Sequence, residues 1–300
     1  MTVHLGVGGA ERPGKGRPGG EWGAAARGPS QSGDGSGVDR APGYRRTGGS
    51  VGRCVPRGAR ARCSATTVEG MELIDALRTT GAVRQYRDAA VPDETVYRVL
   101  DTARFAPNGG NRQAWRVILV KDPSLRRAMR DIYLPGWYEY LAQVTAGLTP
   151  WAVVTDRELE HRSVAGAPAI AQAAAVGPGG FAEHLDEVPV MLVLLADFAK
   201  LATVDRDADH YTLVGGASVY PFAWSILLAA RTEGLAGVMT TMVVRDEAAV
   251  KELLGVPDTV TVAGVLALGQ PVHQPTRLRR EPVEAFATID RFDGTPLAAP

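Results

Sequence analysis

The spacing of apolar residues predicts five helices between residues 71 and 300. The clearest begins at Val91-Pro92-Asp93-Glu94, where a proline and two acids suit the first turn of a helix. Apolar residues then recur at positions 96, 99, 100 and 103, which places them on one side of the helix as a buried stripe. The other predicted helices cover residues 72–78, 124–133, 213–234 and 246–254.

Four shorter apolar segments predict strands, at residues 115–121, 188–196, 238–244 and 259–268. The run 188–196 is apolar throughout, as expected for a strand covered on both faces. Residues 219–230 are nearly as apolar, so the helix around them is expected at the centre of the domain or in a subunit interface. Residues 134–180 are less regular. Because helices and strands alternate irregularly and no repeat is present, the sequence favours an α+β layered domain over a doubly wound sheet.

Residues 1–70 differ from the rest of the chain in composition. They hold 18 of the 35 glycines, 11 of the 33 Lys and Arg residues and both cysteines, and they show almost no apolar periodicity. Too little apolar surface is available to offset the entropy of ordering, so we expect a disordered Gly/Arg-rich leader. No apolar run of signal-peptide length is present, which gives export little support. The alternative is that Met71 is the true start of the protein.

The charge and cysteine content of residues 71–300 narrow the class of protein. With 22 basic and 28 acidic side chains, this part carries a net charge of −6, which argues against nucleic acid or an anionic membrane as the main partner. No run reaches the roughly 18 apolar residues of a membrane span. Cys54 and Cys63 both precede residue 71. Disulfides and thiolate catalysis are therefore excluded from this part, and a cytoplasmic location is the simplest expectation.

The usual catalytic motifs are missing from the sequence. It contains no GxSxG, no HExxH, no Walker loop and no GxGxxG after a strand. His161, His184, His210 and His273 lie far apart, and the acidic run at residues 205–209 lacks the glycine and the final glutamate of a calcium loop. We therefore expect no metal site, and we expect a bound cofactor to carry the chemistry.

Three separate segments offer groups that suit such a cofactor. They are Thr80-Gly81-Ala82-Val83-Arg84, the loop at residues 106–115 (the asparagine loop), and the group Arg277, Arg279 and Arg280. Planar amides and backbone N–H groups suit the edge of a flat heterocycle, and guanidinium groups suit a phosphate. Each segment also has an ordinary interpretation, as a connecting loop or as a solvated charged surface.

Taken together, these segments resemble the FMN-dependent nitroreductase family over essentially all of residues 71–300. Any one motif is weak, but five in order at suitable separations form a strong signal. The motifs are Arg84-Gln85-Tyr86 with Val91-Pro92-Asp93-Glu94, Ala106-Pro107-Asn108-Gly109-Gly110-Asn111-Arg112-Gln113-Ala114-Trp115, Leu227-Leu228-Ala229-Ala230-Arg231 with Gly234-Leu235-Ala236-Gly237, Leu254-Gly255-Val256-Pro257, and Leu268-Gly269-Gln270-Pro271 with Arg279-Arg280-Glu281-Pro282.

The resemblance implies a three-layer α-β-α sandwich with a mixed, mainly antiparallel central sheet. It also implies a homodimer with two FMN sites at the subunit interface. The implied activity is two-electron transfer by a ping-pong route from NADH or NADPH to a small planar acceptor, such as a nitroaromatic or a quinone. Two alternatives stay open: an enzyme of the same fold with other chemistry (flavin fragmentation, dehalogenation or dehydrogenation), and a protein that only stores FMN.

The resemblance also implies which residues bind FMN and substrate. Arg84, Arg279, Arg280 and Arg277 are expected at the phosphate or the ribityl chain, with Gly81 and Ala82 beside them. The isoalloxazine ring is expected to lie against the asparagine loop of the partner subunit and against two threonines of this chain; these residues are Pro107, Asn108, Gly109, Asn111, Gln113, Thr240 and Thr241. Trp137 and Tyr138 are expected in a lid over the substrate, or packed in the core.

The chain departs from the family pattern at one place that matters for cofactor binding. The family often has Arg-Arg-Ser where this sequence has Thr80-Gly81-Ala82. At least one arginine that contacts the phosphate is therefore missing, unless Arg78 reaches round to take its place. The milder departures are Asn108 for serine, Ala114 for proline, and Thr240 where some relatives have glutamate.

Overall fold

The structure is a computed structural model, and it describes residues 71–209 and 212–299. These all belong to the compact unit Cys63–Pro300. The prediction of a disordered leader at residues 1–70 lies outside the described residues.

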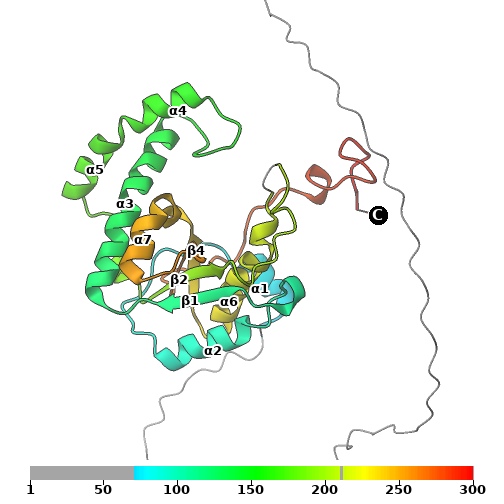
Figure 1. The fold of residues 1–300 in the computed structure, drawn as a ribbon, viewed down its shortest axis with the longest axis horizontal. Helices are drawn as coiled ribbons and strands as arrows, with labels where there is room; N and C mark the ends of the chain where they lie inside the picture. Colours follow the sequence, from blue (N-terminus) through cyan, green and yellow to red (C-terminus); the bar gives the residue numbers. More distant parts are fainter. Residues whose placement is uncertain (1–70, 210–211, 300) are drawn as a thin grey trace, which may run out of the picture. The chain divides into compact units, whose positions relative to one another are not determined.

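A four-stranded antiparallel sheet forms the middle of this unit (Figure 1). Its strands are β1 (Trp115–Leu119), β2 (Val190–Asp197), β3 (Ala236–Thr240) and β4 (Val260–Gly269), in the order β1-β2-β4-β3. All three pairings between described strands are antiparallel. The predicted mainly antiparallel sheet is therefore confirmed.

One face of the sheet is covered by α2 (Asp93–Ala103) and α6 (Tyr220–Thr232). Alternate residues of β2, such as Leu192 and Leu194, face these helices and are fully buried. The rings of Trp115 and Phe222 stack here with centroids 4.5 Å apart.

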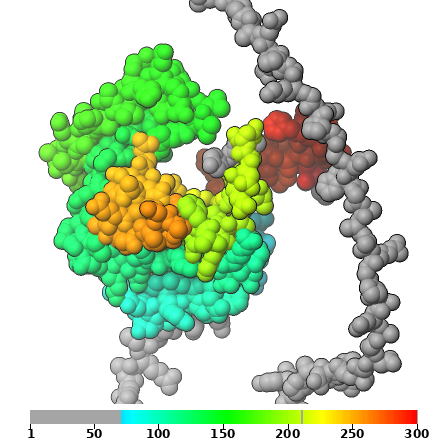
Figure 2. All heavy atoms as spheres, viewed as in Figure 1, coloured from blue at the N-terminus to red at the C-terminus, as the bar shows by residue number. Residues whose placement is uncertain are grey.

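The other face is covered by α3 (Pro123–Thr145) and α7 (Glu247–Leu254). Met191 and Val193, the intervening residues of β2, point to this side and join Met129 of α3 in a second buried cluster. Helices on both faces explain why this strand is apolar at every position, and they confirm the three-layer sandwich. In the space-filling view, α7 (orange) covers the middle of the near face (Figure 2).

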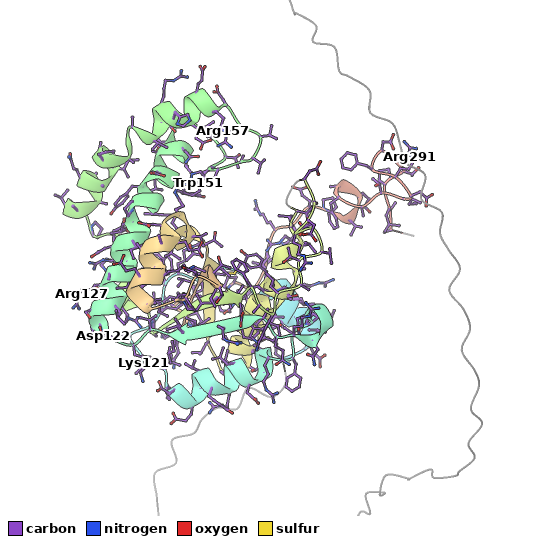
Figure 3. The ribbon with its side chains drawn as sticks, in the orientation of Figure 1. Lys121, Asp122, Arg127, Trp151, Arg157 and Arg291 are labelled. Atoms are coloured by element: carbon purple, nitrogen blue, oxygen red, sulfur yellow. The ribbon has the colours of Figure 1, made fainter. Side chains whose placement is uncertain are left out.

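Local capping groups explain where the two helices of this face begin. The Asp122 side chain accepts hydrogen bonds from the backbone N–H groups of Ser124 (2.8 Å) and Leu125 (3.0 Å), and a proline occupies the first turn of α3. Figure 3 labels Asp122 at this end of the helix. Asp246 caps α7 in the same way, and Gly255 ends that helix with a left-handed φ of 64°.

The prediction that residues 134–180 are irregular is wrong. Helix α3 continues to Thr145, and α4 (Arg157–Val164) and α5 (Ala167–Val176) follow. Pro135 and Gly136 resemble a helix end in sequence, yet both lie inside α3. A Cβ on Gly136 would lie 2.9 Å from Met242 Sδ, so this glycine allows the close approach that holds the helix against the segment after β3.

Two other predicted elements differ at their boundaries. Helix α6 begins at Tyr220 and not at residue 213, because Val214–Ser218 forms a 3-10 helix. Strand β3 ends at Thr240, and Met242–Asp246 is a 3-10 helix where the prediction had strand. The remaining helical segments are α1 (Leu73–Thr79) and the 3-10 turns Gly109–Asn111, Leu185–Glu187 and Val283–Ala285.

None of the helices in the described part of the chain is both long enough and apolar enough to cross a membrane.

The stacked pair Trp115–Phe222 joins the sheet to α6, and its loss is expected to destabilise the whole unit. Replacing Phe222 with Ala should lower the free energy of unfolding by about 3–5 kcal/mol, because a buried ring is lost and a cavity remains. Urea unfolding of the purified variant measures this. Tyr97→Ala, an exposed aromatic on α2, is the control and should stay within about 0.5 kcal/mol of the parent. Equal losses in the two variants would contradict this account of the core.

Candidate functional site

The segment Thr80–Arg84 lies beside the end of the sheet where β3 begins. The backbone N–H of Val83 donates to the Gly237 carbonyl at 3.0 Å, and Gln274 Nε2 donates to the Thr79 carbonyl at 3.0 Å. A Cβ on Gly81 would come within 2.8 Å of Leu278 Cδ2. The structure thus brings the first predicted segment together with the third, which are about two hundred residues apart in sequence.

The arginines of these two segments are exposed and available for a ligand. Arg277, Arg279 and Arg280, together with Leu278 and Glu281, line a hollow of about 590 Å³. Arg84 and the neighbouring Ala82 are exposed as well. Within residues 71–209 and 212–299, no carboxylate forms an ion pair with any of these four guanidinium groups, whereas Arg98, Arg116 and Arg130 are all paired. Such a cluster of unpaired guanidinium groups suits an anion.

Two hydroxyl groups meet above β3 on the α3 side of the sheet. The Tyr133 hydroxyl lies 3.2 Å from Thr240 Oγ1. Burial is the main reason why the pKa of Tyr133 is raised above its usual value, although the Thr240 hydroxyl and the positive charge of Arg84 act in the opposite direction. The phenol therefore stays protonated near neutral pH. Thr241 follows and contacts the position where a Cβ of Gly264 would lie.

The side chain of Asn108 holds the backbone of the asparagine loop through hydrogen bonds. Asn108 Oδ1 accepts from the Gln113 N–H at 2.9 Å, and Asn108 Nδ2 donates to the Ala106 carbonyl at 3.3 Å. Gly110, Asn111 and Gln113 adopt left-handed φ angles of 60°, 52° and 51°. Asn111 and Gln113 are therefore exposed to solvent on a backbone whose left-handed φ angles are unfavourable for residues other than glycine. A loop that only connects two elements does not require such a conformation.

A buried serine fixes this loop to the body of the protein. Ser218 Oγ accepts from the Gly109 N–H at 3.0 Å, and a Cβ on Gly109 would meet Ala202 at 2.9 Å. The preceding Pro107 is exposed. Glycine is thus required at position 109 by space rather than by backbone conformation.

Within one chain, the asparagine loop lies far from the arginines. The loop leads into Trp115, which pairs with Ala196 at one end of β2. Gly237 pairs with Leu268 of β4, and Leu268 pairs with Val190 at the other end of β2. Val190 and Ala196 are six positions apart along β2, which corresponds to about 20 Å. The loop and β3 also belong to opposite edges of the sheet. The structure therefore does not bring the second predicted segment to the other two.

The structure places Trp137 and Tyr138 on different sides of α3. Trp137 belongs to a row of rings that starts at Tyr133 (6.4 Å between centroids) and continues to Tyr140 (5.3 Å, stacked) and Trp151 (6.0 Å from Tyr140). Tyr138 instead lines an apolar groove between α3 and the α4–α5 pair. The row runs outward from Thr240, so Trp137 is the better placed of the two for a ligand near that threonine.

The outer end of this aromatic row is held by polar contacts. The backbone N–H of Trp151 donates to Oε1 of the buried Gln143 at 3.0 Å, and the Arg245 guanidinium lies 4.5 Å from the centre of the Trp151 ring. Arg245 also pairs with Glu139. Trp151 lies near the far end of α3 from Asp122 (Figure 3).

Sequence reasoning missed Tyr133, Ser218 and Gln143 as parts of these sites. Each is polar and buried, and each acts through a partner that is distant in sequence or lies beyond a turn. One signal was available, because Tyr133, Trp137 and Tyr140 recur at i, i+4 and i+7 and so share one side of a helix.

Comparison with known proteins identifies one family for most of the part of the chain that forms the sheet and its helices. The family model described as Nitroreductase family matches residues 77–270. An NADH dehydrogenase of Thermus thermophilus is 27% identical over 207 residues, which covers 68% of this chain and 88% of that protein.

Two solved structures share the fold of this chain. The NADPH:FMN oxidoreductase from Vibrio harveyi in complex with NAD+ is 19% identical with a TM-score of 0.51, covering 73% of this chain and 77% of that chain. An iodotyrosine deiodinase bound to FMN and 3-iodo-L-tyrosine is 21% identical with a TM-score of 0.50, covering 74% of this chain and 100% of that chain. These likenesses show a shared fold, and the family match spans well over half of the sequence. The chain therefore belongs to the nitroreductase family.

Proposed function

We propose that this protein is an FMN-dependent NAD(P)H oxidoreductase of the cytoplasm. In this proposal it reduces small planar acceptors, such as nitroaromatics and quinones, by ping-pong two-electron transfer. The observation that carries the proposal is the meeting of residues 80–84 with residues 277–280 at one end of the sheet. The charge of Arg84, one of these unpaired guanidinium groups, also acts on Tyr133, whose hydroxyl meets Thr240 at the other end of β3.

The groups at this end of the sheet fit the parts of FMN. Arg279, Arg280 and Arg277 would hold the phosphate through charged hydrogen bonds, and Arg84 would lie at the phosphate or the ribityl chain. Gly81 leaves no room for a side chain against Leu278, so the two segments stay close enough to share one ligand. When bound, FMN supplies hydride and electron transfer, which the side chains of this protein do not provide.

The residues near Thr240 would orient and stabilise the ring. The Tyr133 and Thr240 hydroxyls are neutral hydrogen-bond groups, Tyr133 is buried, and the positive charge of Arg84 acts on Tyr133. Donors and a cation held in place before the reaction stabilise negative charge as it develops on a ligand. Trp137 and the row of rings beyond it offer a flat apolar surface for an aromatic acceptor.

We also propose that two copies of the chain form the site together. This proposal is supported by the distance between the asparagine loop and the arginines in a single chain, since the loop of a second copy could supply the ring contacts. Exposed apolar side chains offer an interface: Tyr220 and Trp224 on α6, and Phe286 and Phe292 in the C-terminal segment.

One relative supports an alternative chemistry on the same fold. The deiodinase structure holds FMN with 3-iodo-L-tyrosine, so reductive dehalogenation of an aromatic substrate is the second candidate. The two candidates differ in which oxidised substrate accepts electrons from the reduced protein.

Anaerobic titration of the purified protein tests the proposed activity. NADH or NADPH should bleach the yellow absorbance of bound flavin, and a nitroarene or quinone should restore it, since both half-reactions belong to a ping-pong route. Recovery with 3-iodotyrosine but not with nitroarenes would favour dehalogenation. A yellow protein that ignores both nicotinamides would point to storage, and a protein that stays colourless in excess FMN would reject flavin binding.

The placement of the phosphate predicts the effect of removing two arginines. Arg279→Ala combined with Arg280→Ala should weaken FMN retention by about 1–3 kcal/mol for each charged hydrogen bond that is lost. Equilibrium dialysis against FMN measures this. Arg157→Ala combined with Arg162→Ala removes the same charge from α4 and is the control. Unchanged FMN content in the first double variant would show that the phosphate binds elsewhere.

The shared site predicts complementation between two defective variants. One variant carries Asn108→Ala and Asn111→Ala in the loop, and the other carries Arg279→Ala and Arg280→Ala. Each alone should lose FMN. Heterodimers isolated with two affinity tags should regain about one FMN per two chains, because one of their two sites is intact. A site built within one chain gives heterodimers without FMN, which is the contrary outcome.

A further inference from the structure

Arg231 reaches from the last turn of α6 to the segment that follows α1. Its Nη1 donates to Thr79 Oγ1 at 3.3 Å and to Thr80 Oγ1 at 3.2 Å. The Thr79 hydroxyl donates a hydrogen bond to the Asp75 carbonyl at 2.7 Å, and Thr80 is buried. The guanidinium group is therefore anchored by two hydroxyls at the base of the segment Thr80–Arg84.

This guanidinium group lacks a counterion in the part of the chain that the structure describes. The acid in the same turn, Glu233, pairs with Arg98 at 2.7 Å instead. Desolvation by the surrounding protein lowers the pKa of Arg231, and no charged group acts against it. A cation that is partly removed from water normally has a partner, because desolvating an unpaired charge is costly.

The unused side of the group is available for a ligand. Only Nη1 takes part in hydrogen bonds among residues 71–209 and 212–299, which leaves Nε and Nη2 as a pair of donors with the fork geometry that suits a phosphate. Thr80 accepts from Arg231, so its hydroxyl proton can be donated to the same anion.

The position of Arg231 matches the gap in the family pattern. Thr80-Gly81-Ala82 stands where the resemblance leads us to expect Arg-Arg-Ser. Arg231 brings a guanidinium group to Thr80 from a different element, and the next residue, Gly81, packs against Leu278 between Arg277 and Arg279. A guanidinium group therefore lies beside Thr80, although residues 80–82 themselves contain no arginine.

We propose that Arg231, together with the Thr80 hydroxyl, binds the phosphate of the flavin cofactor in place of the missing arginine. The proposal rests on the proposed function, because it assumes that the cofactor is FMN. It assigns a binding role to Arg231, for which the resemblance implied none.

Flavins with and without the phosphate test this assignment directly. Apoprotein is titrated with FMN and with riboflavin, and quenching of flavin fluorescence gives both dissociation constants. Arg231→Gln keeps a polar side chain beside the threonines but removes the charge. It should weaken FMN binding about tenfold to a hundredfold, as expected for lost charged hydrogen bonds, and leave riboflavin binding unchanged. Arg157→Gln on α4 is the control and should change neither constant.

The outcomes separate this inference from the proposed function. If the parent protein binds neither flavin, the proposed function fails. If the parent prefers FMN and Arg231→Gln keeps the same preference, Arg231 does not bind the phosphate and the proposed function stands. An equal loss for both flavins would show a purely structural role and would also overturn the inference.

A second variant keeps the test decisive if Arg231→Gln does not fold. Arg231→Lys retains the charge but lacks the fork, so it should lose part of the preference for FMN over riboflavin. An unchanged preference in this variant would overturn the proposed paired contact.

Discussion

Helices cover both faces of the four-stranded sheet, and this burial decides where any chemistry can occur. Alternate residues of β2 enter two separate apolar clusters, one under α2 and α6 and the other under α3 and α7. Polar groups cannot lie in the middle of such a sheet without a large desolvation cost. The candidate functional side chains accordingly lie at its ends and edges: Thr80–Arg84 beside the start of β3, the asparagine loop before β1, and Thr240 at the end of β3.

Arginines with and without an acidic partner also lie in different parts of the described chain. Many arginines of the outer helices are paired with nearby acids, as Arg98 is with Glu233 and Arg130 with Asp186. The arginines around residues 80–84 and 277–280 have no such partner in the described chain, and Arg231 holds only threonine hydroxyls. Several guanidinium groups without an ion pair in the described chain therefore lie at one end of the sheet. That arrangement favours an anionic ligand there over a structural role.

The asparagine loop is held firmly in place, yet it lies far from the other candidate binding groups of its own chain. Asn108 and Ser218 hold the loop in a strained, left-handed shape, yet strand pairing puts it about 20 Å from the arginines. A rigid, exposed loop with no ligand groups nearby is understandable when a second copy provides the other half of the site. The exposed aromatic residues of α6 and of the C-terminal segment fit the same view.

Sequence alone determined much of the layout of this protein. Periodicity located α2, β1, β2, α7 and β4, because their apolar residues pack against a core that spans the whole element. Local groups also mark helix ends, as Asp122 does at the start of α3 and as Asp246 and Gly255 do at the two ends of α7. The motifs at residues 84–115 and 227–271 were sufficient for the family. Tertiary structure alone decided the rest. Pro135-Gly136 stays helical because Gly136 packs under Met242, and the segment 242–246 turns away from the sheet after Thr240. Tyr133 meets Thr240, and Arg231 meets Thr80, only because the fold brings distant segments together, and local spacing carries no information about such contacts.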